Sequence, residues 1–122
     1  MILTLIASLS LLQSPNEVLD ELRLLTSKAT LGQACEAIEH TTINWDVLGP
    51  FGMSVIERGE NQGISKSALN DAQEQGAMNM MTYLEEHYAE GRESANFPKL
   101  IEECDTLNRE YPRFYGPFVA ED

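Results

Sequence analysis

The chain has two cysteines, and each lies in the middle of an apolar stripe with helical spacing. In residues 31–45, apolar or small residues recur at intervals of three and four, and Cys35 is one of them. Residues 97–111 repeat this spacing around Cys104. Such spacing marks one buried face of an amphipathic helix. The two cysteines therefore hold equivalent places on two helices, as a disulfide between helices requires.

The redox compartment decides whether these cysteines pair. An oxidising space favours a disulfide, whereas a reducing cytoplasm leaves two buried thiols. Closing a loop of about 70 residues stabilises a fold by about 4 kcal/mol in the chain-entropy model. The sequence has no C-x-x-C pair, so it gives no support to thioredoxin-type redox chemistry.

Residues 1–14 form an apolar leader without an ionisable side chain. Residues 2–12 have the length of a signal-peptide core and are too few to span a bilayer as a helix. No Lys or Arg precedes this core, and cleavage after Ser14 would put Leu12 at the −3 place. We expect a signal peptide and a periplasmic or secreted protein. The alternative is an apolar N-terminal segment buried in a cytoplasmic protein.

Length and charge limit the classes of partner. Residues 15–122 are expected to form a single helical domain with one modest core. Acidic side chains outnumber basic ones by 20 to 8, for a net charge of −12. Phosphate backbones and anionic membrane surfaces repel such a chain, so we expect neither nucleic acid nor, after leader removal, a membrane as partner. A protein partner of unknown identity is compatible with the charge.

The first half of the domain is expected to contain two or three helices. Residues 14–17, Ser-Pro-Asn-Glu, are a capping box that starts a helix ending near Lys28. Thr30 is expected to cap a second helix, which carries Cys35 and runs to about residue 48. Gly49-Pro50 interrupts it and opens either a short third helix or a kinked extension. Gly63, a good left-handed residue, follows.

Two more helices are expected in the second half. Ser65 or Ser67 caps a helix that runs to about residue 89 and stops at Gly91, and Gly76 within it favours close approach by another helix. Ser94 is expected to cap the last helix. No alternating segment of useful length indicates a strand. The fold class is therefore all-α: a single small antiparallel bundle of four to five helices, stapled by a disulfide.

The tail, residues 113–119, is aromatic and irregular. It reads either as a strap over an open end of the bundle or as a docking segment for a partner. In the second reading, the partner-binding residues are Phe114, Tyr115 and Phe118.

Motifs for metal, cofactor or catalytic chemistry are missing from the sequence. Cys35 and His40 would point about 140° apart around a helix, which opposes a shared zinc site with His87. Glu-x-x-His pairs and phosphate-cradling glycine loops are also absent. Adjacent acids such as Glu85-Glu86 point to different sides of a helix and read as solvated faces. We therefore expect no catalytic residue, metal or cofactor, and Trp45 reads as a core anchor.

The layout resembles small exported bacterial helical proteins of unknown function. The resemblance lies in the short apolar leader, a helix with Gln-Ala-Cys-Glu-Ala-Ile at 33–38, and a final helix with Leu-Ile-Glu-Glu-Cys at 100–104. It extends to acid-stress periplasmic chaperones and to periplasmic immunity proteins that block secreted toxins. This resemblance implies a helical fold with one disulfide and a protein partner, and it assigns no functional residue.

Two functional hypotheses follow. The leading one is a non-catalytic exported protein that binds another macromolecule, in an immunity or chaperone-like role, through its acidic exterior and tail. The alternative is a small-molecule carrier or enzyme with a pocket between helices. The residues expected to line that pocket are Trp45, Met78, Met80, Met81 and Tyr83.

Overall fold

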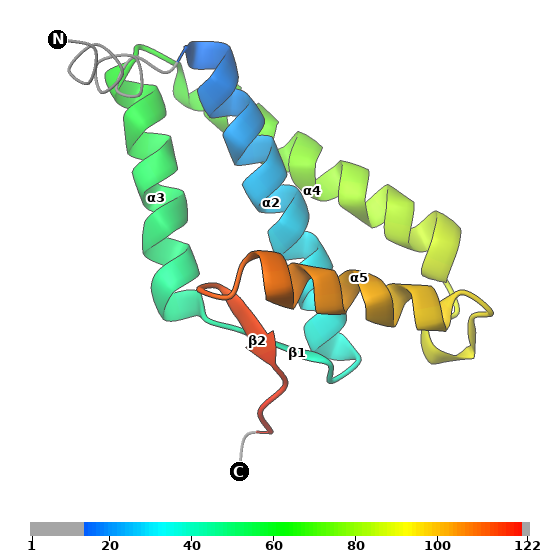
Figure 1. Cartoon of the computed structure of the whole chain (residues 1–122). Helices are drawn as coiled ribbons and strands as arrows, with labels where there is room; N and C mark the ends of the chain where they lie inside the picture. The colour runs from blue at the N-terminus through cyan, green and yellow to red at the C-terminus, as the bar shows by residue number, and fades with distance from the viewer. Residues whose placement is uncertain (1–13, 121–122) are drawn as a thin grey trace, which may run out of the picture.

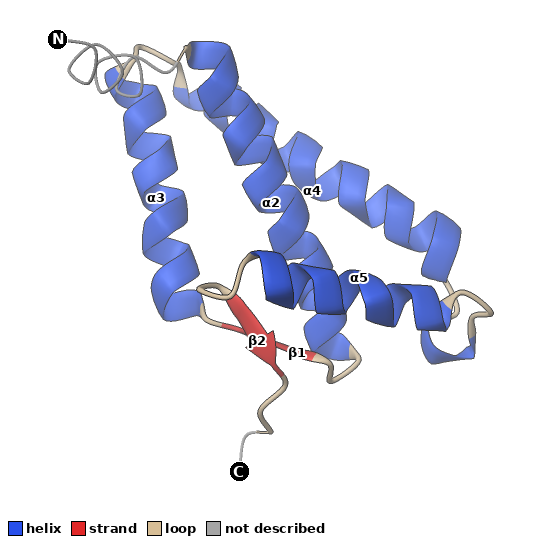
Figure 2. Ribbon diagram, viewed as in Figure 1, coloured by secondary structure: helices blue, strands red, loops and turns tan. Residues whose placement is uncertain are grey.

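The computed structural model describes residues 14–120, so the expected signal peptide, apart from Ser14, lies outside the described residues. The predicted all-α fold is confirmed, with four α-helices in the described part of the chain (Figures 1 and 2). The elements in chain order are α2 (Pro15–Ala37), β1 (Thr41–Ile43), α3 (Trp45–Asn61), α4 (Lys66–Tyr88), the 3-10 helix η1 (Gly91–Glu93), α5 (Phe97–Glu110) and β2 (Tyr115–Pro117).

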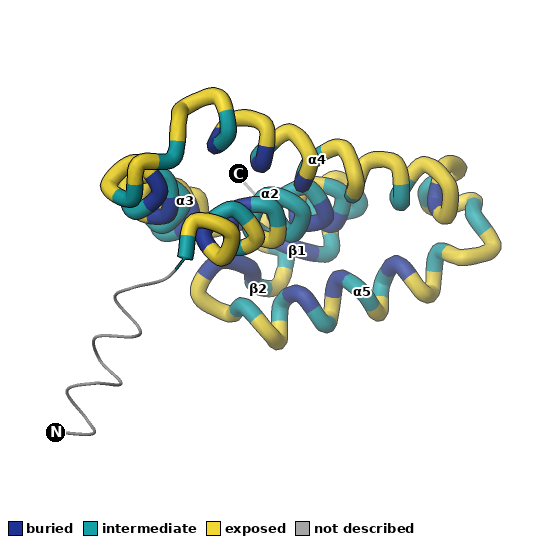
Figure 3. The backbone as a smooth tube through the Cα atoms, turned by 90° about the horizontal axis from the view of Figure 1, so that it is seen from above, coloured by how far each residue is buried: buried dark blue, intermediate teal, exposed yellow. Residues whose placement is uncertain are grey.

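Helix α2 is the centre of the arrangement. Seen from above, α4 covers one side of α2, α5 and the two strands lie on the other side, and α3 lies beside α2 (Figure 3). Because neighbours surround α2 on several sides, its sequence lacks the sharp two-sided pattern of a surface helix. In the described part of the chain, none of the helices has an apolar stretch long enough to cross a bilayer.

The predicted break between Lys28 and Thr30 is wrong, because α2 runs through both. Its start agrees with the expected cap: the Ser14 hydroxyl accepts a hydrogen bond from the Glu17 amide at 3.2 Å. Thr30 is not a cap. Its hydroxyl donates to the carbonyl of Thr26 at 2.9 Å, one turn back within the helix. A threonine that binds the preceding turn in this way leaves the helix intact.

Helix α2 ends at residue 37, whereas the helix that carries Cys35 was predicted to run to about residue 48. The Glu39 amide donates to the Glu36 carbonyl and the His40 amide to the Cys35 carbonyl, at 3.0 and 2.9 Å. This is the Schellman pattern of helix termination, which requires a left-handed residue, and Glu39 fills that place with φ 60°. Glycine is the usual residue there, so the sequence carries no stop signal at this point.

A two-stranded antiparallel sheet contradicts the expectation of no strands. Thr41 pairs with Pro117, Thr42 with Gly116 and Ile43 with Tyr115. Strands of three residues are too short to show an alternating pattern, and their partners are far apart in the sequence. The sheet ties the tail to the end of α2, which places Tyr115 in the core.

Helix α3 passes through Gly49-Pro50, so the predicted interruption there is also wrong. Proline lacks the amide hydrogen that would bind the Asp46 carbonyl one turn earlier. Asp46 is exposed, so water can replace the missing donor. The interruption between the two helices lies upstream, in residues 38–44. The Asn44 carbonyl accepts from the Val47 and Leu48 amides at the start of α3.

The second half of the chain follows the prediction more closely. Ser65 caps α4, accepting from the Ala68 amide at 3.1 Å, and Gly63 has φ 85°. Gly76 lies against α2, as expected. Helix α5 starts at Phe97, and its N-cap is Asn96, which makes no side-chain cap hydrogen bond. The prediction that Ser94 caps this helix is wrong, because its hydroxyl accepts from the Asn96 amide instead.

Two apolar clusters form the core, and α2 contributes to both. The larger holds ten buried residues: Leu31, Cys35, Ile43, Leu48, Tyr88, Leu100, Cys104, Leu107, Phe114 and Tyr115. The smaller lies near the start of α2 and consists of Val18, Leu22, Val55, Leu69 and Ala72. Leu25 and Phe51 pack against both clusters and form the narrow waist between them.

Candidate functional site

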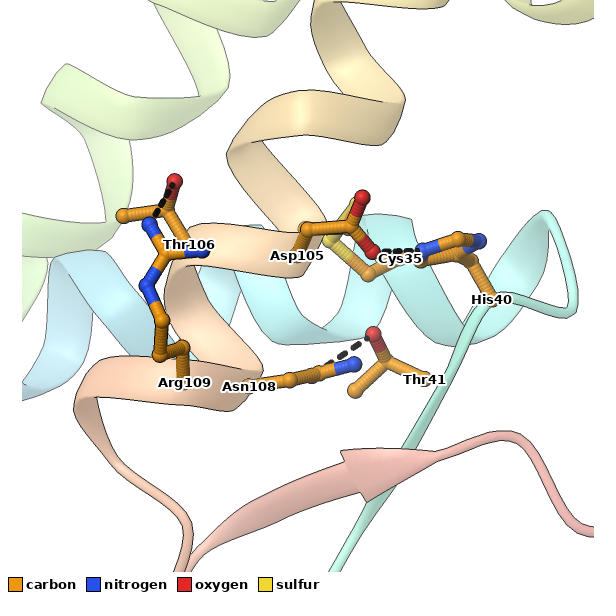
Figure 4. A network of polar contacts seen from close by, with 8 residues as sticks. Cys35, His40, Thr41, Asp105, Thr106, Asn108 and Arg109 are labelled. Atoms are coloured by element: carbon orange, nitrogen blue, oxygen red, sulfur yellow. Dashed lines mark hydrogen bonds and ion pairs between the residues drawn. A yellow bond between two sulfur atoms is a disulfide. The ribbon is translucent and has the colours of Figure 1, made fainter.

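The predicted disulfide links α2 to α5. Cys35 and Cys104 are fully buried, and their Cα atoms are 5.8 Å apart. Polar contacts flank the bond (Figure 4): His40 Nε2 lies 2.6 Å from Asp105 Oδ1, and the Thr41 hydroxyl donates to Asn108 Oδ1 at 3.0 Å. These contacts hold the end of α2 and the start of β1 against α5. They give this region a structural role.

The structure places two of the three predicted docking residues in the core. Phe114 is 7% exposed and Tyr115 is 2% exposed, while Phe118 is half-buried. The Phe114 ring lies 5.1 Å from the Phe51 ring, centroid to centroid. A would-be β-carbon on Gly32 would stand 2.6 Å from the Tyr115 ring, so the tail is seated tightly against α2. This arrangement corresponds to the strap that closes an end of the bundle.

The residues expected to line a carrier pocket do not come together. Met78 and Met81 are exposed on α4, and Met80 and Tyr83 pack against the larger core cluster. Trp45 was expected to anchor the core, but it is 48% exposed at the start of α3. The reason is the new boundary: the predicted helical stripe from Leu31 to Trp45 is broken at Glu39, so Trp45 no longer shares a face with Cys35.

An apolar pocket of about 410 Å³ opens at the waist, beside Leu25 and Phe51. We call it the waist pocket. It forms where α2 and α3 meet the turn after α5, and it has apolar walls with four charged side chains. Its apolar lining residues include Leu24, Leu25, Phe51, Tyr111, Phe114 and Tyr115; the charged ones are Glu21, Lys28, Glu110 and Arg113.

Its charges differ from those of the whole chain. Glu21 is neutralised by an ion pair with Arg58. The Arg113 guanidinium lies 5.6 Å from the centroid of the Phe114 ring. Lys28 and Glu110 form no ion pair with another side chain of residues 14–120. Two cations and two anions therefore line this pocket on a protein whose net charge is −12.

Tyr115, which lines this pocket, carries a hydroxyl that is buried in the core. This hydroxyl has no hydrogen-bond partner in the described part of the chain. Burial, with a contribution from Tyr111, raises the pKa of Tyr115 to about 12, so the hydroxyl keeps its proton at neutral pH. A buried donor without an acceptor costs free energy.

A second polar cluster joins α4 to α5 and has no unused group. The Tyr83 hydroxyl donates to Glu103 Oε1 at 2.8 Å, and the Tyr88 hydroxyl donates to Glu103 Oε2. Burial and the bond to Glu103 raise the pKa of Tyr88 above its usual value. Both carboxylate oxygens accept a hydrogen bond, so we interpret the cluster as a structural contact that holds α4 against α5.

The described part of the chain contains no candidate metal site. Residues 14–120 place no set of three or more His, Cys, Asp and Glu side chains where they could hold a metal ion. His40 contacts Asp105, and the His87 ring packs at a tilt against the Tyr83 ring, with centroids 4.5 Å apart. The waist pocket is therefore our candidate site for a small ligand.

Sequence reasoning missed the waist pocket, although one signal was present. Leu24 and Leu25 are adjacent in α2, and a single buried stripe accommodates only one of them. Leu25 belongs to that stripe, and Leu24 is 50% exposed at the pocket. The other lining residues come from segments far along the chain. Their meeting depends on the path of the tail, which no local pattern contains.

Comparison with protein-family models, curated proteins and solved structures found no match to this chain. Its function is therefore inferred from its own residues.

Proposed function

We propose that this chain is a non-catalytic binding protein that holds a small apolar ligand in the waist pocket. The observation that carries the proposal is the pocket itself, an opening of about 410 Å³ beside Leu25 and Phe51. Small-molecule sites in proteins have volumes of about 300–1,000 Å³, mostly apolar walls and a few polar groups. The lining described above matches that pattern.

Binding of a neutral apolar dye such as Nile red tests this function. The wild-type protein should bind the dye, and Leu24→Glu should abolish binding because it places a carboxylate in the pocket. Leu24 is half exposed, so the substitution leaves the core intact. Met78→Glu is the matched control: Met78 is 58% exposed on α4 and does not line the pocket. Equal dye binding by wild type and Leu24→Glu would remove the proposal.

We propose further that the protein is exported and works in an oxidising compartment. The Cys35–Cys104 disulfide supports this, because such bonds persist mainly outside the reducing cytosol. The apolar leader in the sequence agrees with it. Mass spectrometry of the protein from a periplasmic fraction should find the leader removed and both cysteines oxidised. A full-length, reduced protein in the cytoplasm would contradict export.

A protein partner is the second candidate function, in the immunity or chaperone-like role that the resemblance implies. One observation favours it: a smaller apolar groove of about 230 Å³ opens beside Trp45 and Met53, and both side chains are exposed. Exposed tryptophan and methionine are frequent at protein interfaces. A specific partner should be captured by wild type and by Met78→Ser, and lost by Trp45→Ser/Met53→Ser.

A further inference from the structure

We infer that the waist pocket takes an amphipathic anion: a small molecule with an alkyl or aryl body and one carboxylate or similar acidic head group. This inference rests on the proposed ligand-binding function and adds the chemical class of the ligand. Two features of the pocket carry it: its apolar walls and its local charge.

The walls suit an apolar body. Leu24 and Leu25 come from α2, Phe51 from α3 and Phe114 from the tail, so three segments enclose the same space. Leu24 is half exposed, which leaves apolar surface that a ligand would remove from water. Burial of such surface is the main favourable term in binding an alkyl chain.

The charges favour an acidic head group. Glu21 is paired with Arg58, and this pairing leaves Lys28 and Arg113 against a single carboxylate, Glu110. Only 8 of the 122 residues are basic, and two of them line this pocket. An anion can therefore approach two cations here on a surface that is acidic overall. Hydrogen bonds between a cation and a carboxylate are about twice as strong as neutral ones.

Isothermal titration calorimetry with three matched amphiphiles tests the inference. Decanoate, decanol and decyltrimethylammonium share one alkyl chain and differ in head-group charge, and each is used below its micelle concentration. Decanoate should bind most tightly. Phosphatidylglycerol vesicles form a fourth arm, which separates a free acid from an anionic lipid surface.

Variants of the wild-type protein locate the head group. Lys28→Met should weaken decanoate binding about fivefold or more, as expected for one lost charged hydrogen bond. Lys99→Met is the matched control. Lys99 shares a different, smaller pocket with Lys28, on the face between α2 and α5, and does not line the waist pocket.

The outcomes separate this inference from the proposed function. Equal affinity for decanoate and decanol, or preference for the ammonium amphiphile, would overturn the anionic ligand and leave an apolar pocket in place. Equal weakening by Lys99→Met would move the ligand to the other pocket and overturn the assignment. If the protein co-sediments with the vesicles and does not bind decanoate, the pocket recognises an anionic lipid surface, and the inference of a free acid is overturned. Failure of all three amphiphiles to bind would remove both proposals.

Discussion

Gly76 of α4 lies so close to α2 that a β-carbon at this position would stand 2.3 Å from the carbonyl oxygen of Arg23. The contact is to backbone, which cannot rotate away. We predict that Gly76→Ala lowers the free energy of unfolding by about 2 kcal/mol, because this overpacking outweighs the roughly 1 kcal/mol that alanine gains over glycine in a helix. Urea denaturation followed by circular dichroism measures the change.

Gly52→Ala is the control for this prediction. Gly52 is also inside a helix, α3, but its would-be β-carbon stands 3.7 Å from Leu25 Cδ2, an ordinary contact. Alanine there should raise the free energy of unfolding by about 1 kcal/mol. A loss of stability in both variants would show that the contact with Arg23 is not the cause.

The disulfide should contribute more than any single packing contact. The Cys35–Cys104 bond closes a loop across a sequence separation of 69. We predict that Cys35→Ala/Cys104→Ala loses about 4 kcal/mol of unfolding free energy, mainly because the unfolded chain becomes less restricted. Chemical denaturation with and without reductant checks this. Reductant should destabilise wild type and leave the double variant unchanged.

Glu39→Gly should make the protein more stable. Glu39 holds φ 60° at the end of α2, a conformation that costs an L-residue about 1–2 kcal/mol and costs glycine almost nothing. The substitution also removes a negative charge from a helix C-terminus, where anions are unfavourable. Glycine gives the unfolded chain more freedom, so the expected net gain in unfolding free energy is about 0.5–1 kcal/mol. A lower thermal midpoint would contradict this explanation of how α2 ends.

The buried tyrosines should make stability fall in alkali. Folding raises the pKa of Tyr115 from 10.0 to about 12, and it raises that of Tyr88 as well. Between pH 10 and 12 the folded state therefore holds protons that the unfolded state has lost, and stability decreases as pH rises. Below pH 10 this contribution is constant. Denaturation curves at pH 8 to 12 should show the decrease, and Tyr115→Phe should reduce its slope. An unchanged slope would mean that Tyr115 does not titrate as described.

Local signals predicted several elements correctly because their causes are local. The Ser14 and Ser65 hydroxyls satisfy amides three residues ahead, as the sequence pattern indicates. The stripe around Cys104 became α5, with Leu100, Cys104 and Leu107 buried. The same reasoning failed at Thr30, since threonine can either cap a helix or bind back into it, and only the continuing helix selects the second.

The candidate site was harder to predict than the helices. The sequence singled out Phe114 and Tyr115 but left open whether they face a partner or the core. Their burial depends on the pairing of Ile43 with Tyr115 across more than half of the chain. Met78 and Met81 were expected in a pocket and instead lie on the outer surface of α4. A periodic pattern identifies a face, but it does not say which segments will cover that face.

By itself, the sequence determined the helical class, the two stripes that carry Cys35 and Cys104, and the acidic surface. These follow from the spacing of residues within a few turns and from composition. Only the tertiary structure decided where α2 ends, how the tail folds back and where the waist pocket opens. Glu39 occupies the position at which a glycine would have indicated the end of the helix. The pocket is lined by residues of α2, α3 and the tail. Contacts between such distant segments are selected by the packing of the whole chain, so no local stretch encodes them.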